Sequence, residues 1–516
     1  MKTLEDILYI FKKNHLLLKN KKDFNDDLNK ITKAWEFASV AHQNQKRLSG
    51  EEYIIHPIET AYTLAKMGMD SNTIAAGLLH DIPEETNFSI NDIKEEFGVE
   101  IAKLVDGVTK IGRIKYRGVE RYAENLRKMF IAMSKDIRVI IIRFADRIHN
   151  LKTLEHHPSQ EKQNRIALES LEIYAPIAGR LGMYKFKGQI EDLSFPYVYP
   201  EEYQWTLDEI QTNIKNRTAS LEKTKKKLIN LLIKNNLKFI NVYGRQKHLY
   251  SLYTKLLRKD KDIGKIYDLI ALRVIAKSKN DCYSILGLIH NNWQPLNGRV
   301  KDYISQPKPN AYQSLHTTVF DKNNKPIEIQ IRTLEMEQVA EFGITAHWRY
   351  KENKTINDEY KKFAWIYDLV KWQKKIRNNK DYLKSIKLNT DIFKSRIFVF
   401  TPKNDVIDLP ERSTPIDFAY HIHTEIGNKC IGVKINDKMS KLDTELKNGD
   451  LIEILTDKNR KIPNTDWLNF VKTNTAKDNI RAALSKSQKN NLRKFKQGVV
   501  KKFKKYINKK NNRPPD

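Results

Sequence analysis

The chain has 516 residues, of which 40% are hydrophobic and 30% are charged, and its formal net charge is +30. This length predicts three or four domains with ordinary cores, and the charge favours polyanionic partners such as nucleotides or RNA. Two isolated cysteines exclude a four-cysteine zinc site and a disulfide framework. No apolar run reaches the roughly 18 residues that a membrane helix needs, and the N-terminus has no signal-peptide core. We therefore expect a cytoplasmic protein without a membrane partner.

Residues 1–195 are predicted to form an all-α domain. Apolar residues recur at helical spacing in Ile74–Leu79 and Val139–Ile142, and strand-like alternation is absent. Two prolines between Asp192 and Pro200 indicate the boundary with the next domain.

Residues 196–351 are predicted to form an α+β domain. Its start is rich in helix, and helical periodicity returns at Glu335–Lys351. Short strands are expected at Lys238–Tyr243, Lys265–Ala276, His316–Phe320 and Pro326–Thr333.

The rest of the chain divides into three segments. Residues 352–393 are typical of a charged helical connector. Residues 394–457 predict a small β-rich module with one short helix at Ile416–His421 and strands at Arg396–Thr401, Cys430–Ile435 and Leu451–Leu455. Residues 458–516 predict a basic helical segment, and we expect its end, Lys509–Asp516, to be disordered.

Histidines and carboxylates gather in the helical domain at His56, His80, Asp81 and Asp146. Two imidazoles and two carboxylates suit a borderline divalent ion such as Mn²⁺ or Zn²⁺, which could activate water. An isolated His-Asp pair is more often a helix end beside a surface carboxylate. Adjacent helical residues point about 100° apart, so His80 and Asp81 reach one ion only if it lies between their directions. Asp146, however, follows a very apolar run and needs a partner there.

Further polar residues surround this set. Asn150 and Thr153 follow Asp146 at helical spacing and share its face. Glu84 and Glu85 follow the His-Asp pair closely enough to orient or activate water.

The segments 47–57, 80–86 and 145–150 resemble the HD-type hydrolase domain of the long RelA/SpoT-homologue family. The resemblance implies that the two histidines and two aspartates hold Mn²⁺. It also implies that Arg47 lies by the guanine base and that Asn150 contacts the nucleotide, and we expect Thr153 to join it. The family's usual Glu-Asp pair is Glu84-Glu85 in this chain, which keeps the charge but moves it by about 1 Å.

The predicted mixed domain carries a basic segment directly after its first strand. This segment holds Arg245, Lys247 and His248, and a basic turn at a strand end is well placed to bind a triphosphate. A solvated basic loop explains the same residues equally well. No Walker A loop or Gly-rich dinucleotide fingerprint occurs in the chain.

Carboxylates lie on two of the predicted strands. Asp268 shares a strand face with apolar residues, while Glu328, Gln330 and Arg332 alternate with three isoleucines. Such a polar row is usually a solvent face. Together, however, Asp268 and Glu328 offer the paired carboxylates that hold Mg²⁺ on a nucleotide, and Tyr312 offers a stacking surface for a base.

These segments resemble the synthetase domain of the same family, which has a nucleotidyltransferase-like fold and transfers pyrophosphate from ATP to the ribose 3′-hydroxyl of GDP or GTP. The resemblance implies that Arg245, Lys247 and His248 bind ATP. It implies that Asp268 and Glu328 hold Mg²⁺, that Glu328 also deprotonates the 3′-hydroxyl, and that Tyr312 stacks on guanine. The remaining expected substrate contacts are polar residues: Lys301, Lys308, Asn310, Gln313, His316 and Arg332.

Two details bear on this synthetase activity. The segment Arg299–Asp302 has the basic form that is found in bifunctional family members. Ala311 stands where the family usually has glycine, and a glycine needed at positive φ would cost about 1 kcal/mol to replace.

Residues 394–457 resemble the family's β-grasp-like TGS module, most closely at Thr414–Gly427. In relatives that sense starvation on ribosomes, the position of His423 approaches the 3′ end of uncharged tRNA. The family usually continues with a zinc-finger-like domain and an ACT domain, which we expect this chain to lack. Uncharged tRNA and the ribosome are therefore expected as partners only through the TGS module and the basic tail.

The leading hypothesis is a bifunctional enzyme of the stringent response, which makes and hydrolyses (p)ppGpp in separate sites. One alternative is a hydrolase whose synthetase domain serves only as a nucleotide sensor. A less favoured alternative is a non-enzymatic tRNA- or ribosome-binding factor, which would leave both sets of chemical residues unexplained.

Overall fold

A computed structural model of the chain describes residues 2–15, 21–112, 128–266, 269–308, 312–321, 324–343, 345–346, 396–402, 406–447, 449–457, 459–460 and 462–486. The chain forms two compact units, Met1–Ser385 and Ile386–Asp516, and each is described by itself. The predicted connector at 352–393 and the predicted disordered end at 509–516 lie outside the described residues.

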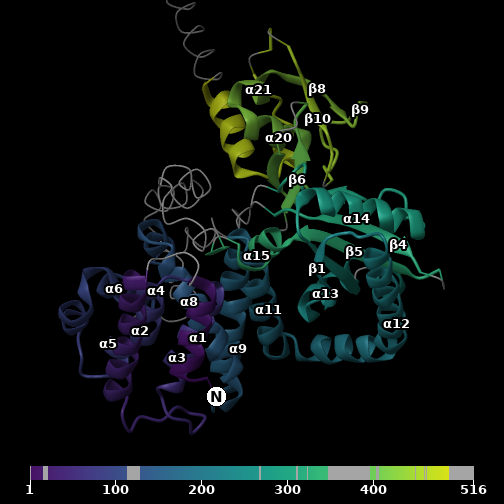
Figure 1. Cartoon of the computed structure of the whole chain (residues 1–516). Coiled ribbons are helices and arrows are strands. Elements are labelled where there is room, and N and C mark those ends of the chain that lie inside the picture. Colours follow the sequence, from purple (N-terminus) through teal and green to yellow (C-terminus); the bar gives the residue numbers. More distant parts are fainter. Residues whose placement is uncertain are drawn as a thin grey trace, which may run out of the picture. The chain divides into compact units, whose positions relative to one another are not determined.

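All the named elements in the first part of the first unit are helices (Figure 1), so the all-α prediction is confirmed. Its elements are α1 (Leu4–His15), α2 (Lys21–Ala41), α3 (Ile55–Met67), α4 (Ser71–Leu79), α5 (Ile82–Glu85), α6 (Ile90–Gly112), α8 (Arg138–Lys152), η1 (Leu154–His156), α9 (Gln160–Glu169), the π-helical η2 (Ser170–Tyr174), α10 (Ala175–Arg180) and α11 (Tyr184–Val198).

The buried helix α4 ends where the predicted His-Asp pair begins. All but one of its residues, Asn72, are buried, as expected of a helix that is packed on several sides. The Asp70 side chain accepts a hydrogen bond from the backbone N–H of Thr73 at 2.9 Å and caps its start. The helix stops before His80, and α5 begins after Asp81. A turn between two helices, rather than one continuous helix, therefore directs these two side chains.

Helix α11 packs against both the helical part and the mixed part of the first unit. It runs through most of the stretch 192–200 in which we expected a boundary, and Pro196 lies inside it. It packs against α8 and α9 of the helical part, and also against α13 (Leu249–Leu257) and α15 (Leu334–Phe342) of the mixed part. The long helix α12 (Pro200–Lys234) follows, with proline at its first position.

The mixed part is built on a five-stranded sheet of order β1-β2-β5-β4-β3, which confirms the α+β prediction. Strands β2 and β5 are parallel, and the other neighbours are antiparallel. The strands are β1 (Phe239–Gln246), β2 (Ile270–Ala276), β3 (Lys301–Asp302), β4 (Leu315–Phe320) and β5 (Pro326–Thr333).

Two strand boundaries differ from the prediction in ways that matter for function. Strand β1 continues to Gln246, so Arg245 lies on the strand and not in a turn after it. Strand β2 begins at Ile270 and not at Lys265 as predicted, and Lys265 belongs to the short helix η3 (Ile263–Lys265). Asp268 lies between these elements, outside the described residues.

Helices α12 and α14 (Lys279–Asn292) contribute to the core on one face of this sheet (Figure 1). The core includes Ile327, Ile329 and Ile331, which confirms that the three isoleucines of β5 share a face. The opposite row is not a solvent face, since Gln330 is 5% exposed and Arg332 is 1% exposed. Helix α15 packs against β2 and β5 and contributes to this burial.

The end of α15 meets the turn between α10 and α11 at backbone level. Gly343 follows α15 with a φ of 57°, a conformation that favours glycine. A Cβ at this position would overlap the backbone of Leu181, Gly182 and Met183. The mixed part can therefore approach the helical part this closely only because Gly343 has no side chain.

The second unit contains the predicted β-rich module. Strands β6 (Arg396–Phe400) and β7 (Val406–Pro410) pair with each other, and β8 (Cys430–Ile435) lies between β9 (Lys438–Ser440) and β10 (Ile452–Thr456). Helix α20 (Pro415–Ile422) is the predicted one, whereas α21 (Thr424–Lys429), β7 and β9 were not predicted. Short elements of this kind leave little periodicity in a sequence.

A buried carboxylate connects this module to the segment that follows it. Asp417 is 0% exposed and forms a capping box with Thr414 at the start of α20. It also accepts hydrogen bonds from the backbone N–H groups of Lys472 and Thr473 at 2.7–3.1 Å. The following helical segment contains α22 (Trp467–Phe470) and is thereby fixed to the module.

Candidate active sites

The four predicted metal ligands converge, and we call them the metal-ligand cluster: His56, His80, Asp81 and Asp146. Nε2 of His56 lies 3.3 Å from carboxylate oxygens of both aspartates. Nε2 of His80 lies 3.2 Å from Asp81 Oδ1 and 3.9 Å from Asp146 Oδ1. One ligand atom each from His56, His80 and Asp146 lies within 4.8 Å of the other two. Elements far apart in the sequence therefore present their donor atoms to one small volume.

The hydrogen bonds of the two histidines leave Nε2 facing this volume. His80 is buried, and its Nδ1 is 2.8 Å from the carbonyl oxygen of Gly77, to which it donates. Its Nε2 is a buried atom without a hydrogen bond. His56 Nδ1 lies 2.8 Å from Nδ1 of His149. A buried imidazole with its other nitrogen held in this way is typical of metal-ligating histidine, so the donor set fits a divalent cation.

Asp146 is held by its own helix, α8. Arg143 donates to Oδ2 at 2.9 Å and Asn150 donates to Oδ1. Burial alone would raise the pKa of Asp146, but His56, Arg143 and His80 lower it well below its usual range. The carboxylate is therefore ionised at neutral pH, as a ligand of a cation must be.

The predicted nucleotide contacts lie beside this cluster. Arg47 donates to Asn150 Oδ1 at 2.7 Å and approaches Nδ1 of His149 at 3.2 Å. Burial, with the nearby His56 and Arg47, lowers the pKa of His149 to about 3, so its neutral ring can accept these contacts. Thr153 ends α8, and its hydroxyl donates to the carbonyl oxygen of His149 at 3.2 Å. Arg47, Asn150 and Thr153 are thus connected through α8.

Two residues that we did not single out from the sequence support Asp81. The hydroxyl of Tyr53 donates to Asp81 Oδ2 at 3.0 Å. The ring of Tyr53 stacks on His42 with centroids 4.7 Å apart, and Nδ1 of His42 lies 2.8 Å from Gln45 Oε1. Tyr53 and His42 lie near His56 and Arg47 in the sequence, but no local spacing indicates that Tyr53 contacts Asp81 or that His42 packs on Tyr53.

The paired carboxylates Glu84 and Glu85 lie in α5, immediately after Asp81. Both are exposed, unlike the cluster itself. The backbone N–H groups of Glu84 and Glu85 donate to the carbonyl oxygen of Asp81 at 3.0 and 2.9 Å, so the pair adjoins the cluster. The pair is therefore placed at the solvent side of the cluster.

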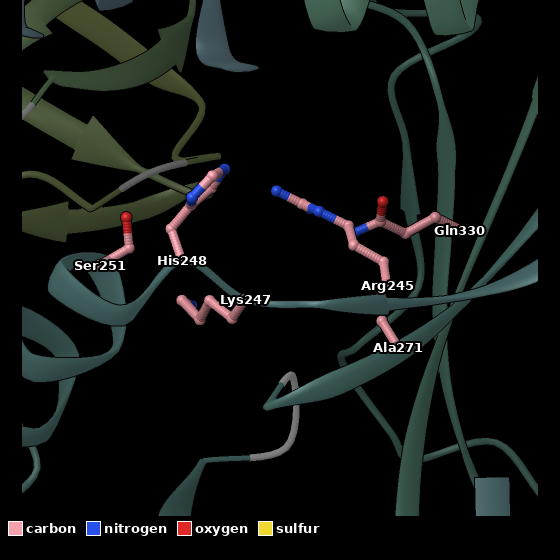
Figure 2. Close-up of a pocket in the computed structure, with 6 residues that line it drawn as sticks. All are labelled: Arg245, Lys247, His248, Ser251, Ala271 and Gln330. Carbon is pink, nitrogen blue, oxygen red and sulfur yellow. The ribbon is translucent and has the colours of Figure 1, made fainter. Parts of the chain in front are cut away.

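A pocket in the mixed part contains the predicted basic residues (Figure 2). We call it the basic pocket, and it is lined by Arg245, Lys247, His248, Ser251, Ala271 and Gln330. Figure 2 shows the guanidinium of Arg245 and the ring of His248 pointing toward each other, while Lys247 extends in another direction. Burial, followed by the charges of Arg273 and Arg332, lowers the pKa of Arg245. A polyanion in this pocket would offset that repulsion.

Glu328 lies on β5 and is engaged by two neighbours. Gln330 donates to its Oε1 at 2.9 Å, and Nδ1 of His316 lies 3.2 Å from the same oxygen. Nε2 of His316 lies 2.8 Å from the hydroxyl of Tyr312. The predicted base-stacking residue and the predicted catalytic carboxylate are therefore connected through one histidine.

The predicted substrate contact Arg332 is paired inside the protein. Its Nε lies 2.8 Å from Glu337 Oε2, and its NH2 group donates to Gln330 Oε1 at 3.0 Å. Glu337 belongs to α15 and also pairs with Arg273. With 1% of its surface exposed, Arg332 supports Gln330 in this structure. A direct contact between Arg332 and substrate stays a prediction.

The other predicted acceptor contacts surround Tyr312. Lys308 Nζ lies 4.6 Å from the ring centroid of Tyr303 and 5.0 Å from that of Tyr312. Gln313 donates to the carbonyl oxygen of Ile304 at 3.1 Å. Lys301 is exposed and lies opposite His316 in the β3–β4 pair. Asn310 and Ala311 lie outside the described residues.

His423 belongs to the second unit, where it ends α20 and caps α21. Its Nδ1 accepts a hydrogen bond from the backbone N–H of Glu425 at 3.2 Å, and the residue is exposed. The other ring nitrogen, Nε2, is therefore the one that a partner would meet. Among the described residues, no helix is both long and apolar enough to cross a membrane.

Comparison with protein families identifies three domains in the chain. Residues 34–184 match the HD domain, residues 244–355 match the region found in RelA / SpoT proteins, and residues 397–456 match the TGS domain. The HD and RelA/SpoT domains imply dependence on a divalent metal. The metal-ligand cluster lies within the first match, and the basic pocket lies within the second.

Several known proteins are similar to this one along most of the chain. A GTP pyrophosphokinase of Myxococcus xanthus is 46% identical over 90% of this chain and 61% of its own length. A guanosine-3′,5′-bis(diphosphate) 3′-pyrophosphohydrolase of Aquifex aeolicus is 45% identical over 89% and 65%. The bifunctional (p)ppGpp synthase/hydrolase RelA of Mycobacterium tuberculosis is 42% identical over 90% and 63%. The chain thus spans about three-fifths of the length of these relatives, and its similarity to them extends over about nine-tenths of its own residues.

Proposed function

We propose that the chain is a bifunctional enzyme of the stringent response. It would transfer pyrophosphate from ATP to the 3′-hydroxyl of GDP or GTP, and would hydrolyse the 3′-pyrophosphate of (p)ppGpp at a second site. The observation that carries the proposal is the presence of two sites of opposite character in one unit. The metal-ligand cluster collects buried imidazoles and carboxylates, whereas the basic pocket collects cations.

Hydrolysis would take place at the metal-ligand cluster. Mn²⁺ held by the four ligands would lower the pKa of a water molecule and make it a nucleophile at neutral pH. Arg47 and Asn150 would bind the nucleotide beside the cluster, with Thr153 next to them. Glu84 and Glu85, at the solvent side of the cluster, would take the proton that the attacking water loses. Pyrophosphate would then leave the ribose 3′-oxygen.

Synthesis would take place at the basic pocket. Arg245, Lys247 and His248 would hold the triphosphate of ATP, since clustered cations bind phosphate oxygens strongly. Glu328, together with Asp268, would hold Mg²⁺ on the nucleotide. Glu328 would also accept the proton of the 3′-hydroxyl as that oxygen attacks the β-phosphorus. The bond from the β-phosphorus to the α-phosphate oxygen would break, and AMP would leave.

The acceptor nucleotide would lie near Tyr312. Its guanine would stack on this ring, and Lys308 would meet its phosphates. The polar contacts would come from Lys301, Asn310, Gln313, His316 and Arg332. Lys308, whose Nζ lies 5.0 Å from the centroid of the Tyr312 ring, supports a place for anionic ligands there.

The second unit suggests how such an enzyme could be controlled in the cytoplasm. The exposed His423 on the TGS domain would contact the 3′ end of uncharged tRNA, and the ribosome would be the setting for that contact. The exposure of the ring and the hydrogen bond that fixes Nδ1 support this role. Co-purification of the wild-type chain, and of a His423→Ala variant, with ribosomes and uncharged tRNA would test it.

Two assays test the proposed function directly. We expect a 3′-pyrophosphorylated guanosine nucleotide when the protein is incubated with ATP, GDP and Mg²⁺. We also expect release of pyrophosphate when the protein is incubated with that product and Mn²⁺. Activity in the second assay alone would leave a hydrolase with a nucleotide-sensing synthetase domain. Inactivity in both would leave a non-enzymatic binding factor.

A further inference from the structure

One face of α11 supplies side chains to the edge of the basic pocket. Asp192 Oδ2 lies 2.7 Å from Nδ1 of His248, which lines the pocket. The other oxygen of the same carboxylate, Oδ1, accepts a hydrogen bond from the backbone N–H of Tyr250 at 3.0 Å. A single carboxylate therefore fixes both the ring of His248 and the start of α13.

The start of α13 has no cap from its own N-cap residue. His248 occupies that position and makes no capping hydrogen bond, and helix starts leave several N–H groups without partners. Asp192 supplies the missing acceptor from another helix, and its negative charge is favourable at a helix N-terminus. The capping bond and the ring bond together leave the carboxylate little freedom to rotate.

Gly188 lies one turn before Asp192 on α11 and shapes the same contact. A Cβ at this position would overlap Cδ2 and Nε2 of the His248 ring. The ring is therefore packed against the helix backbone on one side and bonded to Asp192 through Nδ1. These two constraints fix the orientation of the ring, and Nε2 is the ring nitrogen that Asp192 does not engage.

Neither family match includes these two residues. The HD match ends at residue 184, and the RelA/SpoT match begins at residue 244. Helix α11 also packs against α8, which carries Asp146 and Asn150. A residue of the segment between the two matched domains thus orients a side chain of the basic pocket.

We propose that Asp192 is a positioning residue of the synthetase site, which orients His248 toward the phosphates of the pyrophosphate donor, with Gly188 providing the space for the ring. The proposal rests on the proposed function of the basic pocket as the ATP site. Asp192 itself would not touch ATP; it would act through His248.

The decisive variant is Asp192→Asn, which keeps the size of the side chain but removes its charge and one of its two acceptor oxygens. We expect KM for ATP in synthesis to rise about tenfold, which corresponds to the loss of one charge-assisted hydrogen bond. The change in kcat should be smaller, and hydrolysis of the 3′-pyrophosphate should be unchanged. Asp281→Asn is a matched control, because Asp281 lies in the first turn of α14 and bonds to Ser278 outside the pocket.

A double-mutant cycle with His248→Gln separates positioning from simple stability. If Asp192 acts through His248, Asp192→Asn should raise KM for ATP much less in the His248→Gln background than in the wild type. Equal increases in both backgrounds would overturn the proposal. Gly188→Ala offers a second route, because it should raise KM for ATP by pushing the ring while it favours the helix itself.

The outcomes distinguish this proposal from the proposed function. A wild-type chain that synthesises product, with an unchanged KM in Asp192→Asn, would overturn the positioning role and leave the synthetase activity standing. A wild-type chain that makes no product from ATP and GDP would remove both. ¹⁵N-histidine NMR gives a readout without turnover, because loss of the Asp192 partner should change the Nδ1 signal of His248.

Discussion

The metal-ligand cluster and the basic pocket differ in how their side chains are held. In the cluster, the two histidines are buried and Asp146 is 4% exposed, and each is held by other residues of the helical part. In the basic pocket, Arg245 and His248 point toward each other (Figure 2), and the ring of His248 is held by α11. The donor atoms of the cluster suit a small cation, whereas the cations of the pocket suit an extended anion.

This difference suggests how the two proposed reactions could share one unit. A site for a cation needs ionised carboxylates at short distances, and a triphosphate would be repelled there without the metal. A site for a triphosphate needs cations, which would repel Mn²⁺. Side-chain substitutions should therefore separate the two activities.

The largest expected effect is that of Asp81→Ala. This substitution removes a proposed ligand that contacts both histidines of the cluster, so hydrolysis should fall to the detection limit. Synthesis should remain, because no residue of the basic pocket contacts Asp81. Parallel assays of both activities would check this, with Asp92→Ala on α6 as a control in the same domain. Loss of both activities in a folded Asp81→Ala protein would contradict separate sites.

The reciprocal substitution is Glu328→Gln. It keeps a group that can bond to His316 but removes the proposed base and metal ligand, so synthesis should fall by roughly 10²- to 10⁴-fold. Hydrolysis should be unaffected. Initial rates of both reactions would measure this, and Glu335→Gln, an exposed position on α15, is the matched control. Synthesis at the wild-type rate would remove Glu328 from its proposed role.

A smaller effect is expected from Tyr53→Phe. The hydroxyl of Tyr53 donates to Asp81, and burial raises its pKa, so it stays a donor at neutral pH. Loss of a partner of a metal ligand typically costs about 10- to 100-fold in metal affinity or activity. Titration of hydrolysis with Mn²⁺ should show a higher metal requirement, and Tyr62→Phe on α3 should not. An unchanged Mn²⁺ requirement would show that Tyr53 does not orient Asp81.

The smallest expected effect is the pH dependence of acceptor binding. Burial, with the charge of Lys301, lowers the pKa of Lys308 to about 8. Lys308 is therefore charged below that pH and loses its charge above it, so KM for GDP should rise by up to about fivefold between pH 8 and pH 9. Steady-state synthesis across this range would measure the rise. Lys308→Arg should flatten it, because arginine stays charged; an equally steep rise in that variant would assign the titration to another group.

Periodicity was sufficient to predict much of the fold. Residues 326–333 form β5 with the predicted bounds and the predicted apolar face, because strict alternation defines both at once. The end of α4 was not predictable in this way. The apolar pattern of Ile74–Leu79 does not show that the helix stops before His80. The turn between α4 and α5 lets the side chains of His80 and Asp81 point toward the same volume.

The candidate sites were predictable where residues of one type cluster in the sequence. Lys247 and His248 are adjacent and line the same pocket. Asp192 could not be found by the same reasoning, because 56 positions separate it from His248 and its neighbours suggested only a boundary. The burial of Arg332 was also not predictable, since a row of polar residues on a strand does not show that a helix, here α15, covers that row.

The backbone contact at Gly343 has a consequence for how the unit unfolds. Because the end of α15 lies directly against the chain at Leu181–Met183, and α11 packs against elements of both parts, neither part can open there without disturbing the other. We therefore expect the helical and mixed parts to melt in one cooperative transition. A destabilising substitution in either part would then lower the cellular amount of both proposed activities together, even where it leaves one candidate site chemically intact.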